Sequence, residues 1–204
     1  MAEKGVGYPM TQNAPTHRSL LVSCLFLALL LVVCTLLLRQ AGHRLGEALY
    51  PLKYSKQVEA AATEYDVPPS LIYAVIHTES EFDPSAVSPA EAKGLMQLTD
   101  DTYRWALQRE KREEEFLPET LFDPEVNIHY GTCVLSLLQE QFSQTETVLA
   151  AYNAGQGHVR EWLENPAYSA DGETLSDIPF PETAMYVKRV LATRKQYQIL
   201  YHLP

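Results

Sequence analysis

A carboxylic acid interrupts an apolar stripe in the segment 69–81. Ile72, Val75 and Ile76 fall at positions i, i+3 and i+4, which is the spacing of one buried helix face. The next position of that face, i+7, is Glu79. Glu81 lies two residues further on, about 200° around a helix of 3.6 residues per turn, so we expect it to face solvent.

The two acids predict different chemistry. A carboxyl group in an apolar environment has a raised pKa, stays protonated near neutral pH and can donate a proton as a general acid. The pattern makes Glu79 the candidate acid. The alternative is that the helix has ended by Glu79, so that the side chain simply turns into water.

Two further segments carry polar side chains in apolar surroundings. Gln97 follows the apolar pair 95–96, and Tyr152 and Asn153 lie at the end of a predicted helix that stops at Gly155. By itself, each residue has an ordinary explanation: Gln97 as a cap or surface residue, Tyr152 as a core residue and Asn153 as a polar group near a helix end. Combined with Glu79, they form one candidate site.

A series of helices is expected to position these residues. Their ends are marked by proline in first turns, by Thr, Asp and Ser N-caps and by a terminal glycine. We expect helices over 55–65, 69–81, 99–111 (capped by Thr99), 124–142 (capped by Asp123), from a Ser143–Glu146 capping box to Gly155, 157–164 and 181–201. Because no strand pattern or repeat is present, the predicted fold class is all-α.

Charge divides the 204-residue chain into two parts. Residues 20–38 carry no charge, whereas residues 57–204 carry 10 Lys and Arg against 24 Asp and Glu, a net charge of −14. A helix over 20–38 would be about 28 Å long, which matches a hydrocarbon core of about 30 Å. We therefore predict that residues 20–38 cross a membrane. Nucleic acid is excluded as a partner because the acidic part lacks the clustered cations that phosphates require.

Cysteine and histidine give no sign of a metal or a cofactor. The three cysteines cannot form a disulfide framework, and Cys133 is interpreted as a small core residue. The six histidines have no ligand spacing. We predict no metal and no organic cofactor.

Five ordered blocks between about residues 55 and 201 resemble the soluble lytic transglycosylase (SLT) family of peptidoglycan-cleaving enzymes. That family has a lysozyme-like fold related to goose-type lysozyme. The blocks are Glu79-Ser80-Glu81-Phe82, Ala86-Val87-Ser88-Pro89 with Gly94-Leu95-Met96-Gln97, Asn127-Ile128 with Gly131, Ala151-Tyr152-Asn153-Ala154-Gly155, and Pro181-Glu182-Thr183 with Tyr186-Val187. The apolar segment and the Tyr50-Pro51-Leu52 junction look like the small membrane-anchored members from Gram-positive bacteria.

The resemblance implies a role for each site residue. Glu79 is implied as the single catalytic acid/base, and Tyr152 as the hydroxyl that positions or polarises its carboxyl. Asn153 would mainly fix the turn that carries Tyr152. The residues implied to contact the glycan or line its cleft are Ser88, Met96, Gln97, Asn153, Glu182 and Tyr186.

The implied reaction explains why one acid is enough. Ordinary glycosidases need two carboxyl groups. A lytic transglycosylase instead uses the C6 hydroxyl of its N-acetylmuramic acid (MurNAc) substrate as an internal nucleophile, which gives a 1,6-anhydro product. Two alternatives stay open. One is another enzyme, a muramidase in which water attacks the glycosidic bond, and the other is a catalytically idle wall-binding scaffold.

The chain departs from the family pattern in three places. Glu91 stands where the family usually has Gly, Thr99-Asp100 replaces Met-Pro, and Gln156 replaces Pro. If position 91 requires a positive φ, a glutamate there costs about 1 kcal/mol or reshapes the turn. These departures concern loop shape and glycan preference rather than the catalytic group.

The expected organisation is a cytoplasmic tail over 1–18, a signal anchor over 19–39, a juxtamembrane linker over 40–54 and a catalytic domain over 55–204. More Lys and Arg follow the apolar segment than precede it, and this bias alone would place the domain in the cytoplasm. Peptidoglycan lies outside the membrane, however. We therefore predict a single-pass membrane protein with an extracytoplasmic catalytic domain.

Overall fold

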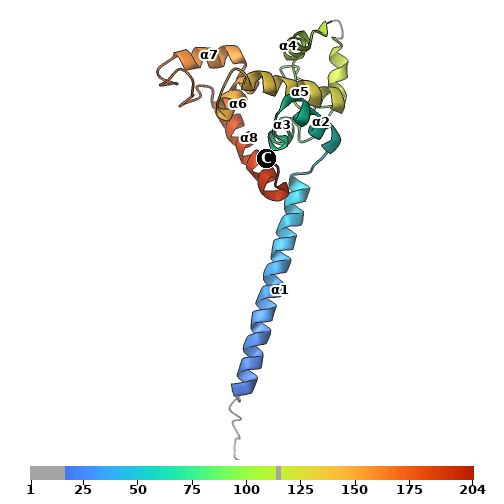
Figure 1. Cartoon of the computed structure of the whole chain (residues 1–204), viewed down its shortest axis with the longest axis vertical. Coiled ribbons are helices and arrows are strands. Elements are labelled where there is room, and N and C mark those ends of the chain that lie inside the picture. The colour runs from blue at the N-terminus through green and yellow to red at the C-terminus, as the bar shows by residue number, and fades with distance from the viewer. Residues whose placement is uncertain (1–16, 114–115) are drawn as a thin grey trace, which may run out of the picture. The chain divides into compact units, whose positions relative to one another are not determined.

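The computed structural model describes residues 17–113 and 116–204, which form two compact units, one ending at Leu45 and one beginning at Gly46. The first unit consists of most of helix α1 (His17–Leu49) (Figure 1). The part from Leu25 to Leu49 is long and apolar enough to cross a membrane. A signal sequence near an N-terminus meets the same criterion of length and composition. The expected tail over 1–18 lies almost entirely outside the described residues.

The second unit includes the end of the segment expected to be a linker. Helix α1 continues to Leu49, and the chain after it is tied to the last helix of the unit. The Tyr201 hydroxyl donates to the Tyr50 carbonyl oxygen at 2.7 Å, and the Tyr197 hydroxyl donates to the Pro51 carbonyl oxygen at 3.2 Å. Residues 46–54 are therefore part of the helical domain.

The domain is built from helices whose ends follow local sequence signals. The elements after α1 are α2 (Ser55–Tyr65), α3 (Pro69–Ser80), α4 (Asp100–Glu110), the 3-10 helix η2 (Pro118–Phe122), α5 (Pro124–Gln139), α6 (Thr145–Ala154), α7 (Gln156–Glu164) and α8 (Pro181–Tyr201). The described residues contain two isolated β-bridges and no extended strand. The all-α prediction is confirmed.

Two predicted N-caps are confirmed and one capping box is wrong. Thr99 accepts a hydrogen bond from the Thr102 amide, and Asp123 accepts from the Glu125 and Val126 amides. Helix α6 begins at Thr145, so its N-cap is Gln144, which makes no side-chain cap. Ser143 lies one residue too early to cap the helix. Helix α5 ends at Gln139, before the expected Phe142.

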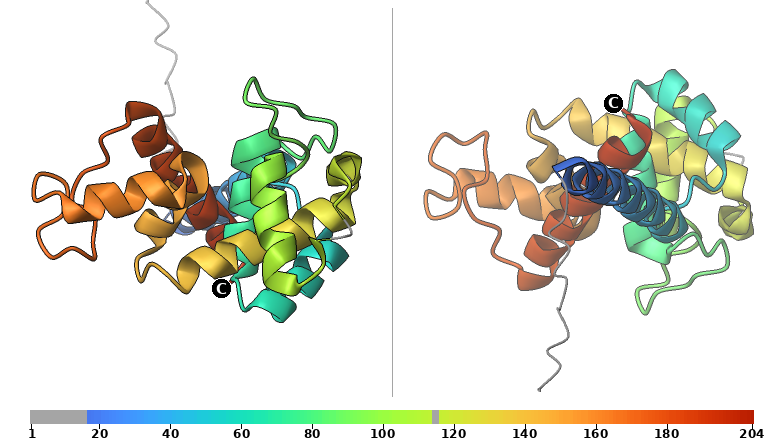
Figure 2. Two further views of the ribbon diagram at one scale, coloured as in Figure 1. Left: turned by 90° about the horizontal axis from the view of Figure 1, so that it is seen from above. Right: turned by 90° about the horizontal axis from the view of Figure 1, so that it is seen from below.

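The core is arranged around α3 and α5. Helix α3 packs against α2 and α8, and lies between them in Figure 1. Helix α5 contacts α2, α4, η2 and α6, and the left view of Figure 2 shows α4 crossing it. All residues from Ser70 to Ile76 are buried, so the middle of α3 is surrounded by protein. The C-terminal end of α3, which carries the candidate acid, emerges from this core.

Candidate active site

Glu79 is the penultimate residue of α3. The stripe that precedes it is fully buried, since Ile72, Val75 and Ile76 are each 0% exposed. Glu79 itself is half-buried, although the helix ends one residue later at Ser80. Glu81 is the C-cap, has a positive φ of 51° and is exposed. The prediction that the two acids face different surroundings is confirmed.

The surroundings of Glu79 favour its protonated form. Burial raises the pKa of this carboxyl from an ordinary 4.5 to about 7. The Tyr186 hydroxyl and the Arg189 cation act in the opposite direction, and both effects are smaller than that of burial. Within residues 17–113 and 116–204, no second carboxylate contributes to the raised pKa. Glu79 can therefore supply a proton near neutral pH.

Tyr186 and Arg189 approach Glu79 from α8, where they are three residues apart and share one face. Tyr186 is only 2% exposed, and burial together with the nearby Glu79 raises the pKa of its hydroxyl. Among the residues that the structure describes, its hydroxyl has no hydrogen-bond partner within 3.5 Å, so its effect on Glu79 acts over a longer distance. Sequence reasoning missed Arg189, although its spacing from Tyr186 was the available signal.

Tyr152 has a different hydrogen-bond partner from the one expected. Its hydroxyl donates to the Met96 carbonyl oxygen at 2.7 Å, so its proton is not directed at the Glu79 carboxyl. Burial and the proximity of Glu79 raise the pKa of Tyr152, which keeps the phenol neutral. In this structure Tyr152 fixes the backbone beside the acid. A direct contact with the Glu79 carboxyl stays a prediction.

Ser88 and Gln97 stabilise the loop between α3 and α4 through hydrogen bonds to its backbone. The Ser88 hydroxyl accepts from the Ala90 and Ala92 amides at 3.2 and 3.1 Å. The Gln97 side-chain amide donates to the carbonyl oxygens of Ala86 and Gly94 at 3.1 and 2.8 Å. Glycan contact by either residue stays a prediction.

Asn127 joins this loop to α5 and was not recognised as a site-forming residue. It is 0% exposed and uses its whole amide: the oxygen accepts from the Met96 amide at 2.7 Å, and the nitrogen donates to the Lys93 and Leu121 carbonyl oxygens at 2.9 and 2.8 Å. A polar residue on an otherwise apolar helix face was the signal. Asn127 thereby fixes the backbone at Met96, whose carbonyl oxygen accepts the hydrogen bond from Tyr152.

Met96 lies beneath the site rather than on its surface. Its side chain is 0% exposed and passes close to Gly131, where an added Cβ would lie 2.4 Å from the Met96 sulfur. Glycine at position 131 is therefore required for this packing. Met96 supports the floor of the site from below, and its expected contact with saccharide stays a prediction.

Asn153 and Glu182 lie where α6 and α8 meet. The Thr183 hydroxyl donates to the Asn153 side-chain oxygen at 2.8 Å, which links the end of α6 to the first turn of α8. This bond fits the expected role of Asn153 in fixing the turn. Glu182 is exposed in the first turn of α8, and no described contact assigns it a role at the site.

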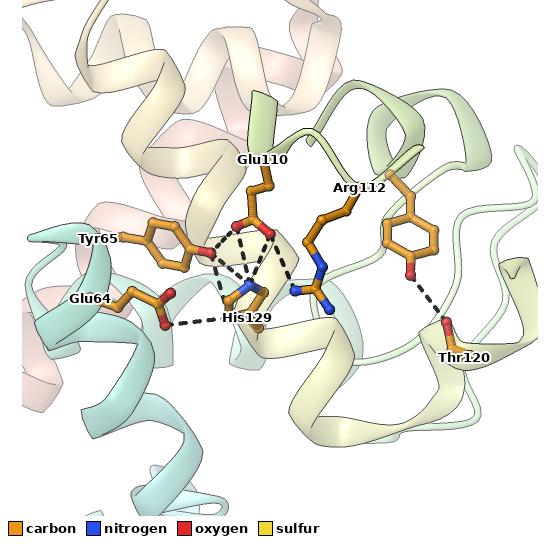
Figure 3. A network of polar contacts seen from close by, with 7 residues as sticks. Glu64, Tyr65, Glu110, Arg112, Thr120 and His129 are labelled. Carbon is orange, nitrogen blue, oxygen red and sulfur yellow. Dashed lines mark hydrogen bonds and ion pairs between the residues drawn. The ribbon is translucent and has the colours of Figure 1, made fainter. Parts of the chain in front are cut away.

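A second polar cluster joins α2, α4 and α5 (Figure 3). The Tyr65 hydroxyl donates to Glu110 and lies 2.7 Å from His129 Nε2, while His129 Nδ1 lies 3.5 Å from Glu64 Oε2. Burial raises the pKa of the neighbouring Cys133 thiol to about 12. A thiol held in its neutral form is a poor nucleophile, which agrees with the interpretation of Cys133 as a core residue. We assign the cluster a structural role.

The sequence matches one known domain family over most of this helical unit. The family described as "Transglycosylase SLT domain" matches residues 56–174. Soluble lytic murein transglycosylase of Escherichia coli K12 is 36% identical over 154 residues, which covers 74% of this chain and 24% of that protein. Membrane-bound lytic murein transglycosylase C of Yersinia pestis is 33% identical over 167 residues, covering 72% of this chain and 47% of that protein.

Solved structures show the same likeness. The 70 kDa soluble lytic transglycosylase of E. coli has a TM-score of 0.66 and 34% identity, and covers 76% of this chain and 25% of that one. A complex of the 70 kDa soluble lytic transglycosylase with bulgecin A gives a TM-score of 0.67 at 34% identity, covering 76% of this chain and 25% of that one. An inactive Glu-to-Gln mutant of lytic transglycosylase Slt from Pseudomonas aeruginosa gives 0.63 at 30% identity, covering 74% and 25%. The chain thus spans between a quarter and a half of these relatives.

Proposed function

This chain belongs to the Transglycosylase SLT domain family, and on that premise we propose that it is a membrane-anchored lytic transglycosylase. Its proposed reaction is cleavage of the β-1,4 bond between MurNAc and N-acetylglucosamine (GlcNAc) in peptidoglycan, without water. The observation that carries the proposal is Glu79, which ends a buried apolar stripe. The pKa of its carboxyl is raised to about 7, and among the described residues no second carboxylate contributes to that shift.

Glu79 acts first as an acid and then as a base. In its protonated form it donates a proton to the glycosidic oxygen, the bond from C1 of MurNAc to that oxygen breaks, and GlcNAc leaves with a free hydroxyl. The Glu79 carboxylate then takes the proton of the MurNAc C6 hydroxyl as O6 bonds to C1. Glu79 thereby regains the proton that it donated, and the product ends in 1,6-anhydro-MurNAc.

The surroundings of Glu79 support this single-acid reaction. A hydrolytic glycosidase places a second carboxyl group about 5 to 9.5 Å from the first. Glu81, the acid nearest in sequence, is exposed at the C-cap of α3 and points away from the buried face. An internal nucleophile on the substrate removes the need for a partner acid.

Helix α1 supports the proposed membrane anchoring. A helix able to cross a membrane precedes the catalytic domain, and a relative is named as membrane-bound. We place the catalytic domain outside the cytoplasmic membrane, where peptidoglycan lies. Protease added to intact protoplasts should digest the domain, whereas complete protection would contradict this topology.

Release of soluble muropeptides from purified sacculi tests the catalytic assignment. Glu79→Gln should lower the rate by about 100- to 10,000-fold, the range that general acid–base catalysis contributes. Glu81→Gln is the matched control, because it makes the same change two residues away at an exposed position and should keep full activity. Full activity of Glu79→Gln would refute the assignment. A biological role unaffected by Glu79→Gln would favour the idle scaffold.

A further inference from the structure

Basic residues of the domain gather on its last helix, α8, which is labelled in Figure 1. Residues 183–204 contain four Lys or Arg and no Asp or Glu. Residues 57–182 contain six Lys or Arg against 24 Asp or Glu, a net charge of −18. Most of residues 183–204 belong to α8. This helix is therefore the cationic part of an otherwise acidic domain.

One face of α8 combines two lysines with apolar side chains. Five exposed residues, spaced by three or four positions along the helix, share this face: Met185, Lys188, Ala192, Lys195 and Ile199. Met185 is 60% exposed and Ile199 is 57% exposed. Among the residues that the structure describes, neither lysine forms an ion pair with a carboxylate. We call these five residues the α8 outer face.

Hydrogen bonds at the end of α8 tie this helix to the point where the chain enters the domain. The Tyr201 hydroxyl donates to the Tyr50 carbonyl oxygen, and the Tyr197 hydroxyl donates to the Pro51 carbonyl oxygen. The helix that is able to cross a membrane ends at Leu49, the residue before Tyr50. Anchoring through α1 therefore keeps the C-terminal end of α8 close to the surface of the bilayer.

Further cations surround the same attachment point in the sequence. Arg39 and Arg44 follow the charge-free segment, and Lys53 and Lys56, both exposed, follow α1. Glu47 is the one acid in this stretch. These cations produce the charge bias that by itself would place the domain in the cytoplasm. Binding to lipid headgroups gives them a role that does not depend on a cytoplasmic location.

We propose that the α8 outer face docks onto the surface of a membrane that contains anionic lipids. This inference rests on the proposed membrane anchoring and goes beyond it. Lys188 and Lys195 contact the headgroup phosphates, and the Met185 and Ile199 side chains enter the boundary between headgroups and acyl chains, as in helices that lie in a membrane interface. Each Lys or Arg near an anionic surface strengthens binding about fivefold. The acidic remainder of the domain is repelled by the same surface, which favours one orientation.

Docking leaves the candidate active site facing away from the membrane. Tyr186 is buried and acts on Glu79, whereas Lys195 is exposed. Tyr186 and Lys195 are nine residues apart, which is two and a half turns of a helix with 3.6 residues per turn, so they lie on opposite sides of α8. The side of α8 that faces Glu79 is therefore turned towards the proposed substrate, because peptidoglycan lies outside the membrane.

Acylation of lysines by a membrane-impermeant reagent measures docking of the full chain in lipid vesicles. Lys188 and Lys195 should react about fivefold more slowly with phosphatidylglycerol present than in phosphatidylcholine alone, which corresponds to about 1 kcal/mol per lysine. Lys111 is the internal control, because it is exposed at the end of α4 in the acidic part of the domain and should react equally in both vesicles. Added sodium chloride should reduce the difference at Lys188 and Lys195, because salt screens exposed charges.

A charge reversal on the same face gives an independent check. Lys195→Glu should return the reactivity of Lys188 in anionic vesicles to its value in neutral vesicles. Lys111→Glu is the matched control, since it makes the same change away from α8 and should leave Lys188 protected. Equal reactivity of Lys188 and Lys195 in the two kinds of vesicle would overturn the proposal. Protection by soluble poly(glycerol phosphate) in neutral vesicles, with none by anionic lipid, would assign the face to a phosphate polymer and would overturn it as well.

The same acylation measurement on Glu79→Gln separates docking from the proposed reaction. This variant should form no anhydro product, yet Lys188 and Lys195 should be protected as in the wild type, because docking does not use the catalytic group. Wild-type protein that docks but forms no anhydro product would refute the proposed reaction and keep the docking. Wild-type protein that forms anhydro product without protection of the two lysines would refute only the docking.

Discussion

Replacing Glu79 by Gln should stabilise the protein at alkaline pH, although it removes the catalytic group. In the unfolded chain this carboxyl ionises near its ordinary pKa of 4.5, whereas in the folded protein burial raises the pKa to about 7. At about 1.36 kcal/mol per pKa unit, this difference corresponds to about 3 kcal/mol. The side chain is half-buried and solvent screens part of the effect, so we expect about 2 kcal/mol.

The sign follows from where the proton is held. Below pH 4.5 both states of the wild type keep the proton. As pH rises towards 7 the unfolded state loses it while the folded state retains it, so the free energy of unfolding falls. Above about pH 7 the full cost of a buried carboxylate remains. Gln has no proton to lose, so the stability of Glu79→Gln relative to the wild type should rise between pH 4.5 and 7 and then stay constant.

Urea unfolding of the full chain in detergent micelles, followed by far-UV circular dichroism at several pH values from 4.5 to 8.5, measures this difference. Charges elsewhere cancel because both proteins share them. Glu81→Gln is the control, and its stability relative to the wild type should change little with pH because Glu81 is exposed. A Glu79→Gln difference that does not vary with pH would refute the claim that burial holds this carboxyl protonated.

Further predictions concern the pH profile and the loop that carries Met96. The kcat/KM of the wild type should fall above about pH 7 as Glu79 loses its proton, and Tyr186→Phe should move that fall to higher pH because it removes a group that lowers the pKa. Glu91 has a φ of 59°, so Glu91→Gly should raise the free energy of unfolding by about 0.5 kcal/mol, whereas Glu91→Ala should not. Asn127→Ala should lower it by about 3 kcal/mol, because three buried backbone groups lose their partners; thermal unfolding checks both changes.

Local signals account for what could be predicted from the sequence. The stripe that ends in Glu79 and the caps at Thr99 and Asp123 depend on residues within one or two helical turns, and the structure has them as expected. The positive φ at Glu91 also follows from local pattern, since the family usually has glycine there.

Long-range partners account for what could not be predicted. The acceptor of the Tyr152 hydroxyl is a backbone carbonyl 56 residues away, and Asn127 reaches the same loop from 31 residues away. Neither pairing leaves a periodic pattern in the sequence. The same is true of Arg189, whose effect on Glu79 depends on how α8 packs against α3. The capping box at Ser143 failed because the start of α6 shifted by one residue, a difference that local sequence does not specify.

Cleavage of purified sacculi in water enriched in oxygen-18, followed by mass spectrometry of the products, tests the central claim most directly. Attack by the C6 hydroxyl uses no water, so the wild type should give 1,6-anhydro-MurNAc ends without the heavy isotope, and Glu79→Gln should give no new ends. Reducing MurNAc ends that carry one oxygen-18 atom would show hydrolysis by a muramidase and would contradict the account.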